Sequence, residues 1–281
     1  MNKSIINDNT INNYKLAIYN YRFRDDVKYG SRHPRHNIHY LSDVKSIISQ
    51  LPSKIDLSYL VKDIYDINDI KCSGSAAVCL ALKIILNQKY KASFFNSKSI
   101  YDNISILYNY NLSRIYEESK LSDDDNSMIE TCLQIIMEYK FCDAELLKYN
   151  ILNKSTHPPL RCFENANLHK RLNFNYEKLS QDLKSIKMNL SQGYPVIVGI
   201  VIFESIYKCI NGLLLTPNSD KEKILGSHVI VLIGYDDDKQ TFKFVNCLGK
   251  NWGNNGFGYI MYDYITNNQI AGDIYSLKYL N

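Results

Sequence analysis

The sequence lacks the features that mark nucleic-acid-binding and membrane-spanning proteins. Its 33 basic and 29 acidic residues leave a formal net charge of only +4, and no run is rich in lysine or arginine. So mild a balance does not favour binding to nucleic acid. No apolar run approaches the ~20 residues of a membrane span, and residues 1–30 lack the basic start and apolar core of a signal peptide. We therefore expect no nucleic-acid partner, no membrane partner and a place in the cytoplasm.

Motifs for cofactors and metals are missing as well. The chain has no glycine-rich phosphate loop, no HExxH and no internal repeat. Its seven cysteines are an odd number without a C-x-x-C pair, so we expect a reducing compartment and mostly free thiols. His33, His36 and His39 could bind a metal, but Pro34 argues against a regular helix that presents all three. We predict no cofactor and no metal site.

A strand-turn-strand pattern near the carboxyl end brings a histidine and an asparagine together. His228 begins a buried-looking strand, and Asn246 ends the next one. If Gly234 lies opposite Gln240 across a five-residue loop, His228 and Asn246 are cross-strand partners. An asparagine that holds a histidine in one tautomer is the orienting part of a nucleophile–base–orienter triad. A core histidine satisfied by a strand-end asparagine gives the same pattern, so the pair alone leaves both interpretations open.

One other stretch has the shape that a nucleophile needs. In Lys71–Leu80, KCSGSAAVCL, small and turn-forming residues lead into an apolar run that continues to Leu86. We therefore expect a buried helix from Ser75 to about Leu86. The unpaired N–H groups and the positive dipole end at its amino terminus would favour an anionic nucleophile and an oxyanion.

With these two stretches, the chain resembles the papain-like (C1) cysteine peptidases, in particular the compact branch of microbes and large DNA viruses. Leu51–Leu57, LPSKIDL, is similar to the family's entry to the mature domain, and Cys72–Ser75, CSGS, lies where the family has Cys-Gly-Ser-Cys. Asn246–Phe257, NCLGKNWGNNGF, is similar to the family's highly specific NSWGxxWGxxGY loop. The resemblance spans about Leu51 to Leu280.

The resemblance implies a fold, an activity and a site. The fold is α+β, with a helical lobe packed against an antiparallel β-barrel-like lobe and a peptide cleft between them. The activity is hydrolysis of peptide bonds, in which Ser75 attacks the carbonyl, His228 moves the proton and Asn246 orients His228. The substrate is a peptide or protein, and the protein is a monomer of the cytoplasm or a virion. The expected cleft-lining residues are Gly74, Asn126, Ser127, Ser227 and Trp252.

The chain departs from the family pattern at several positions. Ser75 stands where the family has its nucleophilic cysteine, and Ala76 replaces the aromatic that follows. The glutamine that supplies an oxyanion donor falls on Asp69, whose carboxylate would repel an oxyanion; a one-residue shift would place the Asn68 amide there instead. Leu248 replaces a tryptophan that shields the Asn–His bond. The family pattern also allows a disulfide between Cys72 and Cys132.

The resemblance and the local patterns divide the chain. With 281 residues and 45% hydrophobic content, the core is large enough for one domain or two halves sharing a cleft. Residues 1–50 are a leader or pro-segment, or else a packed extension, and residues 51–281 form the peptidase domain. Its helical half covers about 51–160 and its strand-rich half about 170–281. The expected elements beyond those above are helices at Ser42–Leu51, Met128–Tyr139 and Tyr176–Leu190, strands at Val196–Phe203 and Gly256–Met261, and a connector at Ile151–Arg171.

Three interpretations of Ser75 stay open at this stage. The chain is a cysteine peptidase whose nucleophile was replaced by design, a natural pseudopeptidase that keeps the cleft for binding or a structural role, or a working serine variant. A serine hydroxyl must lose its proton during the attack, whereas a cysteine beside a histidine can rest as a thiolate. The departures at Asp69 and Ala76 favour the pseudopeptidase over the designed change.

Overall fold

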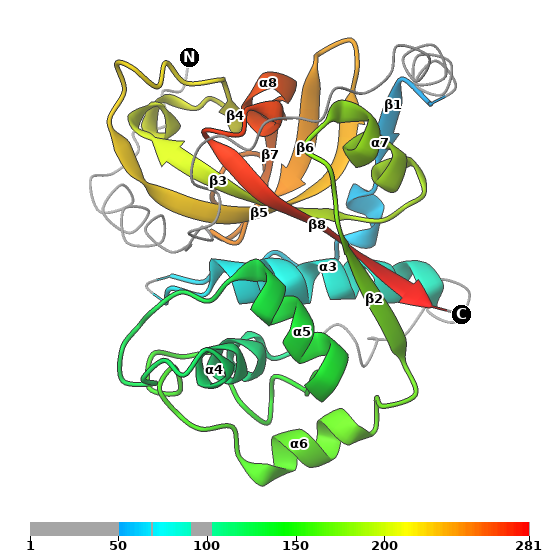
Figure 1. The fold of residues 1–281 in the computed structure, drawn as a ribbon, viewed down its shortest axis with the longest axis vertical. Coiled ribbons are helices and arrows are strands. Elements are labelled where there is room, and N and C mark those ends of the chain that lie inside the picture. Colours follow the sequence, from blue (N-terminus) through cyan, green and yellow to red (C-terminus); the bar gives the residue numbers. More distant parts are fainter. Residues whose placement is uncertain (1–50, 69, 91–102, 281) are drawn as a thin grey trace, which may run out of the picture.

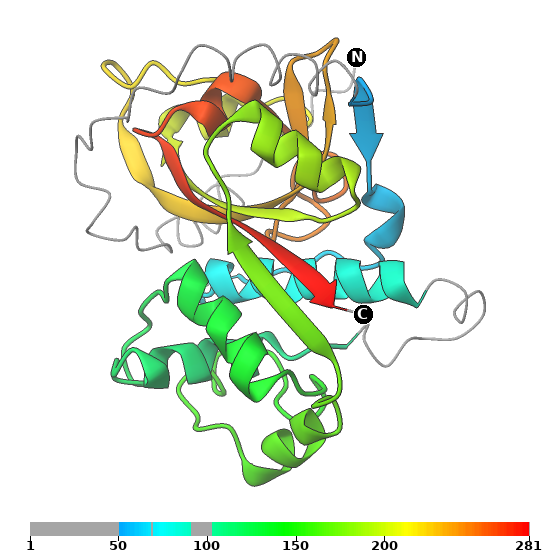
Figure 2. The same ribbon diagram turned by 45° about the vertical axis from the view of Figure 1, so that its right-hand side comes forward.

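The computed structural model describes residues 51–68, 70–90 and 103–280. These residues form a helical half and a strand-rich half, with one helix, α3, running between them (Figures 1 and 2). The helical half contains α3 (Ser73–Lys89), α4 (Ile106–Tyr116), α5 (Ile129–Tyr139) and α6 (Leu160–Asn167). The expected leader at 1–50, with its three histidines and its helix at Ser42–Leu51, lies outside the described residues.

The strand-rich half is an open sheet with helices on one face. Its strands are β1 (Lys54–Asp56), β2 (Asn173–Lys178), β3 (Val196–Phe203), β4 (Leu213–Leu214), β5 (Ile224–Asp236), β6 (Thr241–Val245), β7 (Phe257–Met261) and β8 (Ala271–Leu280). The remaining elements of this half are η2 (Ser58–Leu60), α7 (Leu183–Ser191), η4 (Glu204–Lys208) and α8 (Tyr262–Thr266). The order is β2-β8-β3-β5-β6-β7-β4, with β1 paired to β5. The predicted α+β architecture is present, but the eight strands described do not close into a barrel.

The two faces of the sheet pack against different layers. Val229, Val231 and Val245 lie in one core with α3, α4 and α5. The other face contributes to a second core that α7 and α8 cover, as Figure 1 shows. Because β5 contributes alternate residues to both cores, its side chains connect the helical half to the far layer of the molecule.

Most predicted elements are present, and one helix was placed wrongly. The helix expected at Tyr176–Leu190 begins only at Leu183, where the Asp182 carboxylate caps it by accepting the Ser185 N–H at 2.8 Å. Tyr176 lies instead in β2, which pairs with β8. The pairing with β8 made this segment a strand, and local periodicity cannot reveal such a distant partner. The expected connector likewise contains α6.

The β5–β6 hairpin has a different register from the predicted one. Asp236 pairs with Thr241, which leaves a four-residue loop, and the register shifts again between Leu232 and Gly234. The last pair joins Val231 to Val245, so Asn246 follows the strand. Directly opposed pairing of His228 with Asn246 was therefore wrong, because the prediction assumed a longer loop and no bulge.

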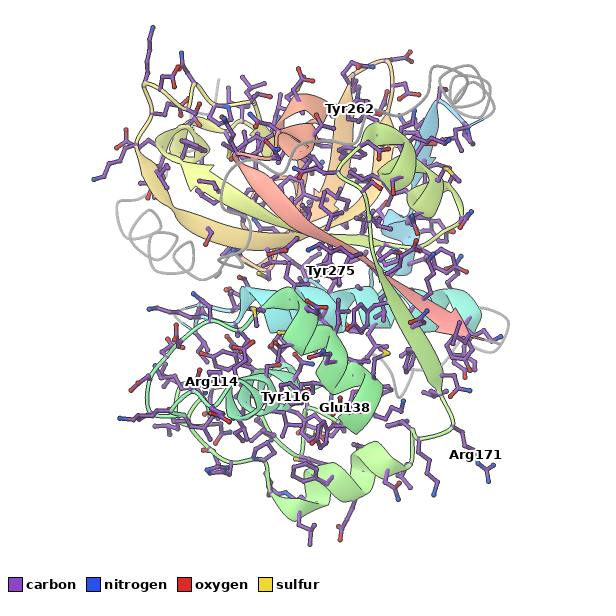
Figure 3. All side chains as sticks on the ribbon, in the orientation of Figure 1. Arg114, Tyr116, Glu138, Arg171, Tyr262 and Tyr275 are labelled. Atoms are coloured by element: carbon purple, nitrogen blue, oxygen red, sulfur yellow. The ribbon has the colours of Figure 1, made fainter. Side chains whose placement is uncertain are left out.

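A buried arginine organises the helical half. Arg114 lies fully buried within it (Figure 3), and its guanidinium stacks 4.1 Å from the Tyr110 ring. It donates hydrogen bonds to three backbone carbonyls and one amide oxygen, those of Leu121, Asp123, Lys154 and Asn111. These bonds hold the loop that follows α4 against α4 itself.

We expect Arg114→Met to lower the free energy of unfolding by about 3 kcal/mol or more, because it leaves several buried acceptors without donors. Urea unfolding measures this change. Arg171→Met is the matched control, since Arg171 is exposed and points away from the molecule (Figure 3), and its effect should stay within about 0.5 kcal/mol. Equal losses in the two variants would contradict the role given to Arg114.

Candidate active site

His228 and Asn246 are in contact although they are not cross-strand partners. His228 Nε2 lies 2.8 Å from Asn246 Oδ1, and both side chains are only 2% exposed. The same oxygen accepts the Cys247 N–H at 2.8 Å, which fixes the asparagine side chain. Because an amide oxygen can only accept, the ring proton is assigned to Nε2. Nδ1 is then a bare acceptor, and it is buried without a hydrogen-bond partner among the described residues.

Burial keeps this histidine neutral. It lowers the pKa of His228 from 6.5 to about 4, and the bond to Asn246 only partly opposes that effect. At neutral pH the ring can therefore accept a proton at Nδ1 but does not carry a charge of its own.

A thiol also lies next to this ring. Cys247 Sγ is 3.7 Å from His228 Nε2. Burial raises the pKa of the Cys247 thiol well above its usual range, so the group stays protonated. Because the thiolate is the nucleophilic form of cysteine, Cys247 is not suited to attack a carbonyl.

The amino end of α3 presents backbone donors. The first bond within the helix runs from the Ala76 N–H to the Cys72 carbonyl at 2.9 Å, so the amides of residues 73–75 have no acceptor inside the helix. Ser75 lies in this first turn, as predicted, but its Oγ is 3.3 Å from Cys132 Sγ on α5. No hydrogen bond within the described part of the chain joins Ser75 to His228.

The disulfide that the family pattern allows is not formed. All cysteines are free in the described chain, including Cys72 and Cys132. Cys72 Sγ lies 3.4 Å from the Tyr149 hydroxyl, while Cys132 contacts Ser75. Burial raises the pKa of both thiols to about 12, so neither rests as a thiolate.

Of the two candidate oxyanion residues, the structure describes Asn68 but not Asp69. Asp69 lies outside the described residues. Asn68 is exposed and has a left-handed backbone (φ 43°), and its N–H donates to Asp66 Oδ1 at 3.2 Å. The described contacts of Asn68 therefore give it no link to His228.

Asn126 and Ser127, two of the expected cleft-lining residues, form a buried strip beside α3. A Cβ added to Gly74 would meet the Ser127 carbonyl at 3.4 Å, so the glycine permits this close approach. The strip is tethered by Asp124, whose Oδ1 accepts the Tyr110 hydroxyl at 2.7 Å and the Lys71 N–H at 3.2 Å. Sequence reasoning missed this tether, because an aspartate in an acidic loop carries no periodic signal.

Trp252 and Ser227, two other residues expected to line the cleft, lie in different surroundings. Trp252 is buried in the second core with its ring 5.7 Å from that of Phe244, so the structure places it within the strand-rich half. Leu248 is buried in the same core. Ser227 is half-buried and precedes His228 on β5.

Comparison with known proteins identifies the family. Residues 120–277 match the model of the papain family of cysteine proteases. The chain belongs to this family. It resembles the crystal structure of xylellain, a cysteine protease from Xylella fastidiosa, with a TM-score of 0.75, 22% identity and coverage of 94% of this chain and 96% of that one. It also resembles procathepsin B S9 from Trypanosoma congolense, with a TM-score of 0.64, 12% identity and coverage of 97% and 89%.

A curated relative is an uncharacterized peptidase C1-like protein of Acanthamoeba polyphaga mimivirus, 28% identical over 183 residues. That match covers 62% of this chain and 58% of the relative. The papain-like fold is therefore established, and the family is one of hydrolases. The match to the family model contains His228 and Asn246 but begins after α3.

A search of the described residues for membrane spans and for metal sites found neither. The described residues contain no helix with the length and apolarity needed to cross a bilayer. Nor do they gather three metal-ligating side chains in one place.

We expect the free energy of unfolding to fall as the pH is lowered from about 6.5 towards 4. The unfolded chain takes up a proton on His228 in this window, whereas the folded chain does not, which costs up to roughly 3 kcal/mol. Urea unfolding at pH 7.5 and 4.5 should show a smaller drop for His228→Gln than for the unmodified chain. His169→Gln is the comparison variant. Burial also lowers the pKa of this half-buried histidine, so its drop should lie between those of the unmodified chain and His228→Gln. Identical drops for the unmodified chain and His228→Gln would contradict the assignment.

Proposed function

We propose that this protein is a peptidase that cleaves peptide bonds with a serine hydroxyl at the amino end of α3. His228 is the general base and Asn246 orients it. The observation that carries the proposal is the arrangement of the imidazole, whose Nε2 is bound to Asn246 Oδ1 at 2.8 Å while Nδ1 remains a bare acceptor. This is the arrangement that a proton-accepting histidine needs.

His228 is neutral at physiological pH, because burial lowers its pKa to about 4. A serine hydroxyl needs a neutral base that takes its proton during the attack. The neutral ring is therefore compatible with attack by a hydroxyl, but a base of so low a pKa is a weak one.

The proposed reaction has two stages. The serine oxygen forms a bond to the substrate carbonyl carbon as its proton moves to Nδ1, and a backbone amide at the start of α3 stabilises the oxyanion. The C–N bond then breaks, and the leaving amine takes the proton from Nδ1. Water hydrolyses the resulting ester by the same route and regenerates the serine.

We propose peptides or proteins as substrates and a monomer as the active form. The strip at Asn126 and Ser127 would pair with the substrate backbone, and the Asp124 tether to Lys71 would hold that strip at a constant distance from α3.

The second candidate function is peptide binding without hydrolysis. It is favoured by one contact, in which the Ser75 hydroxyl bonds to Cys132 instead of His228. If Ser75 is the residue at the nucleophile position, the site lacks an aligned nucleophile, and the expected cleft would bind a peptide without cleaving it.

We expect the unmodified full chain to hydrolyse a fluorogenic peptide library slowly, and His228→Ala, purified identically, to lose ~10²–10⁴-fold in kcat/KM because the base is missing. Asn246→Ala should lose less. Since the base is already neutral at pH 5, kcat/KM should be nearly level above that pH. Arg171→Met is the unaffected control. Peptide binding without His228-dependent hydrolysis would favour the binding function.

A further inference from the structure

The segment that leads into α3 is bonded to the strand-rich half. The Ile67 N–H donates to the Cys247 carbonyl at 3.0 Å. Cys247 directly follows Asn246 in the chain, and its Sγ lies 3.7 Å from His228 Nε2. The backbone bond at Ile67 therefore attaches this segment to the residue that lies between Asn246 and the rest of the loop and that contacts the histidine ring.

Tyr149 of the helical half contacts the same segment. It lies between α5 and α6, and its hydroxyl donates to the Ile67 carbonyl at 2.6 Å. The same hydroxyl oxygen is 3.4 Å from Cys72 Sγ. Because the hydroxyl proton is directed at Ile67, the Cys72 thiol is the donor in this second contact. A chain of two hydrogen bonds therefore runs from the thiol through the phenol to the carbonyl.

The two partners of the Tyr149 hydroxyl lie at the two ends of a turn, Ile67–Cys72. The Ile67 carbonyl also accepts the Ile70 N–H at 3.1 Å, which closes the first part of this turn. Cys72 directly precedes the first residue of α3. The turn also contains Asn68, one of the two candidate oxyanion residues. One side chain thus restrains both the beginning of the turn and its junction with the helix.

The surroundings of the Tyr149 hydroxyl keep it in the form that can make both bonds. Burial raises the pKa of Tyr149, and the neighbouring thiols of Cys72 and Cys247 raise it further. The group is therefore a neutral phenol, which donates one hydrogen bond and accepts another. Its ring packs against the core that contains α3. Packing and hydrogen bonding together fix the position of this side chain.

From these contacts we propose that Tyr149 is a positioning residue of the peptidase site. Its hydroxyl holds the turn Ile67–Cys72, and so sets where the backbone amides at the start of α3 lie relative to His228. The inference rests on the proposed peptidase function and adds a residue that acts on the oxyanion only through this turn. Because the oxyanion exists only in the transition state, a displaced donor lowers kcat and leaves substrate binding unchanged.

The first test measures the turn itself and does not require activity. Tyr149→Phe removes only the hydroxyl, so hydrogen exchange at the Ile67 amide, followed by NMR, should become at least about 10-fold faster. The rate is taken relative to that of the buried Ile230 amide in β5, which corrects for changes in global stability. Tyr108→Phe is the matched control, because Tyr108 is also a buried tyrosine of the helical half and donates to a backbone carbonyl, that of Tyr139 at 3.2 Å.

The control should leave the relative exchange rate at Ile67 unchanged, since its lost bond joins α4 to the end of α5. Equal acceleration in the two variants, or none in Tyr149→Phe, would overturn the inference.

The second test uses kinetics to separate positioning from folding. If the chain is active, Tyr149→Phe should lower kcat by roughly 10- to 100-fold and keep KM within about 2-fold, because a misplaced donor affects the transition state alone. The pH profile of kcat/KM should keep its shape, since His228 is unchanged. Tyr108→Phe should keep kcat within about 2-fold. A raised KM at constant kcat in Tyr149→Phe would contradict the proposed role.

The two tests distinguish this inference from the function on which it rests. Hydrolysis whose kcat does not respond to Tyr149→Phe would sink the inference and leave the peptidase function intact. An inactive chain in which Ile67 exchanges faster in Tyr149→Phe alone would sink the function, and Tyr149 would stand as the residue that holds the turn.

Discussion

The burial of α3 on every side is the constraint on which the rest of the structure depends. From Ser73 to Asn87 every residue of this helix is buried, so both halves must pack on it. A helix without a polar face is stable only inside a core. Because the helix starts next to the segment bonded to residues 247–249, the same packing fixes where the first turn lies relative to His228.

That packing also sets the chemistry of the site. Excluding water from His228 makes its charged form costly, and the single bond to Asn246 does not compensate. The same exclusion holds the thiols of Cys72, Cys132 and Cys247 in their protonated forms. A site built this way holds a neutral imidazole next to a protonated thiol.

Hydrogen bonds hold the helical half together in the absence of the disulfide that the family pattern allows. Arg114 and Tyr110 bind the loop that follows α4, and Asp124 passes that restraint to Lys71 at the start of α3. Such a network depends on every donor keeping its acceptor, since unpaired groups in a low-dielectric interior are costly. It suits a chain whose cysteines are all free in the described residues.

The sequence by itself determined the fold class, four of the eight described strands and the contact of His228 with Asn246. These follow from local apolar patterns, turn residues and a loop motif long enough to be specific. Only the tertiary structure decided the bulge in β5, the open sheet, the strand at Tyr176, and the contact of Ser75 with Cys132. The physical reason is that helix phase, strand partners and burial are set by residues distant in the chain. Ser75 is an example, because only the packing of α3 against α5 placed its hydroxyl beside Cys132.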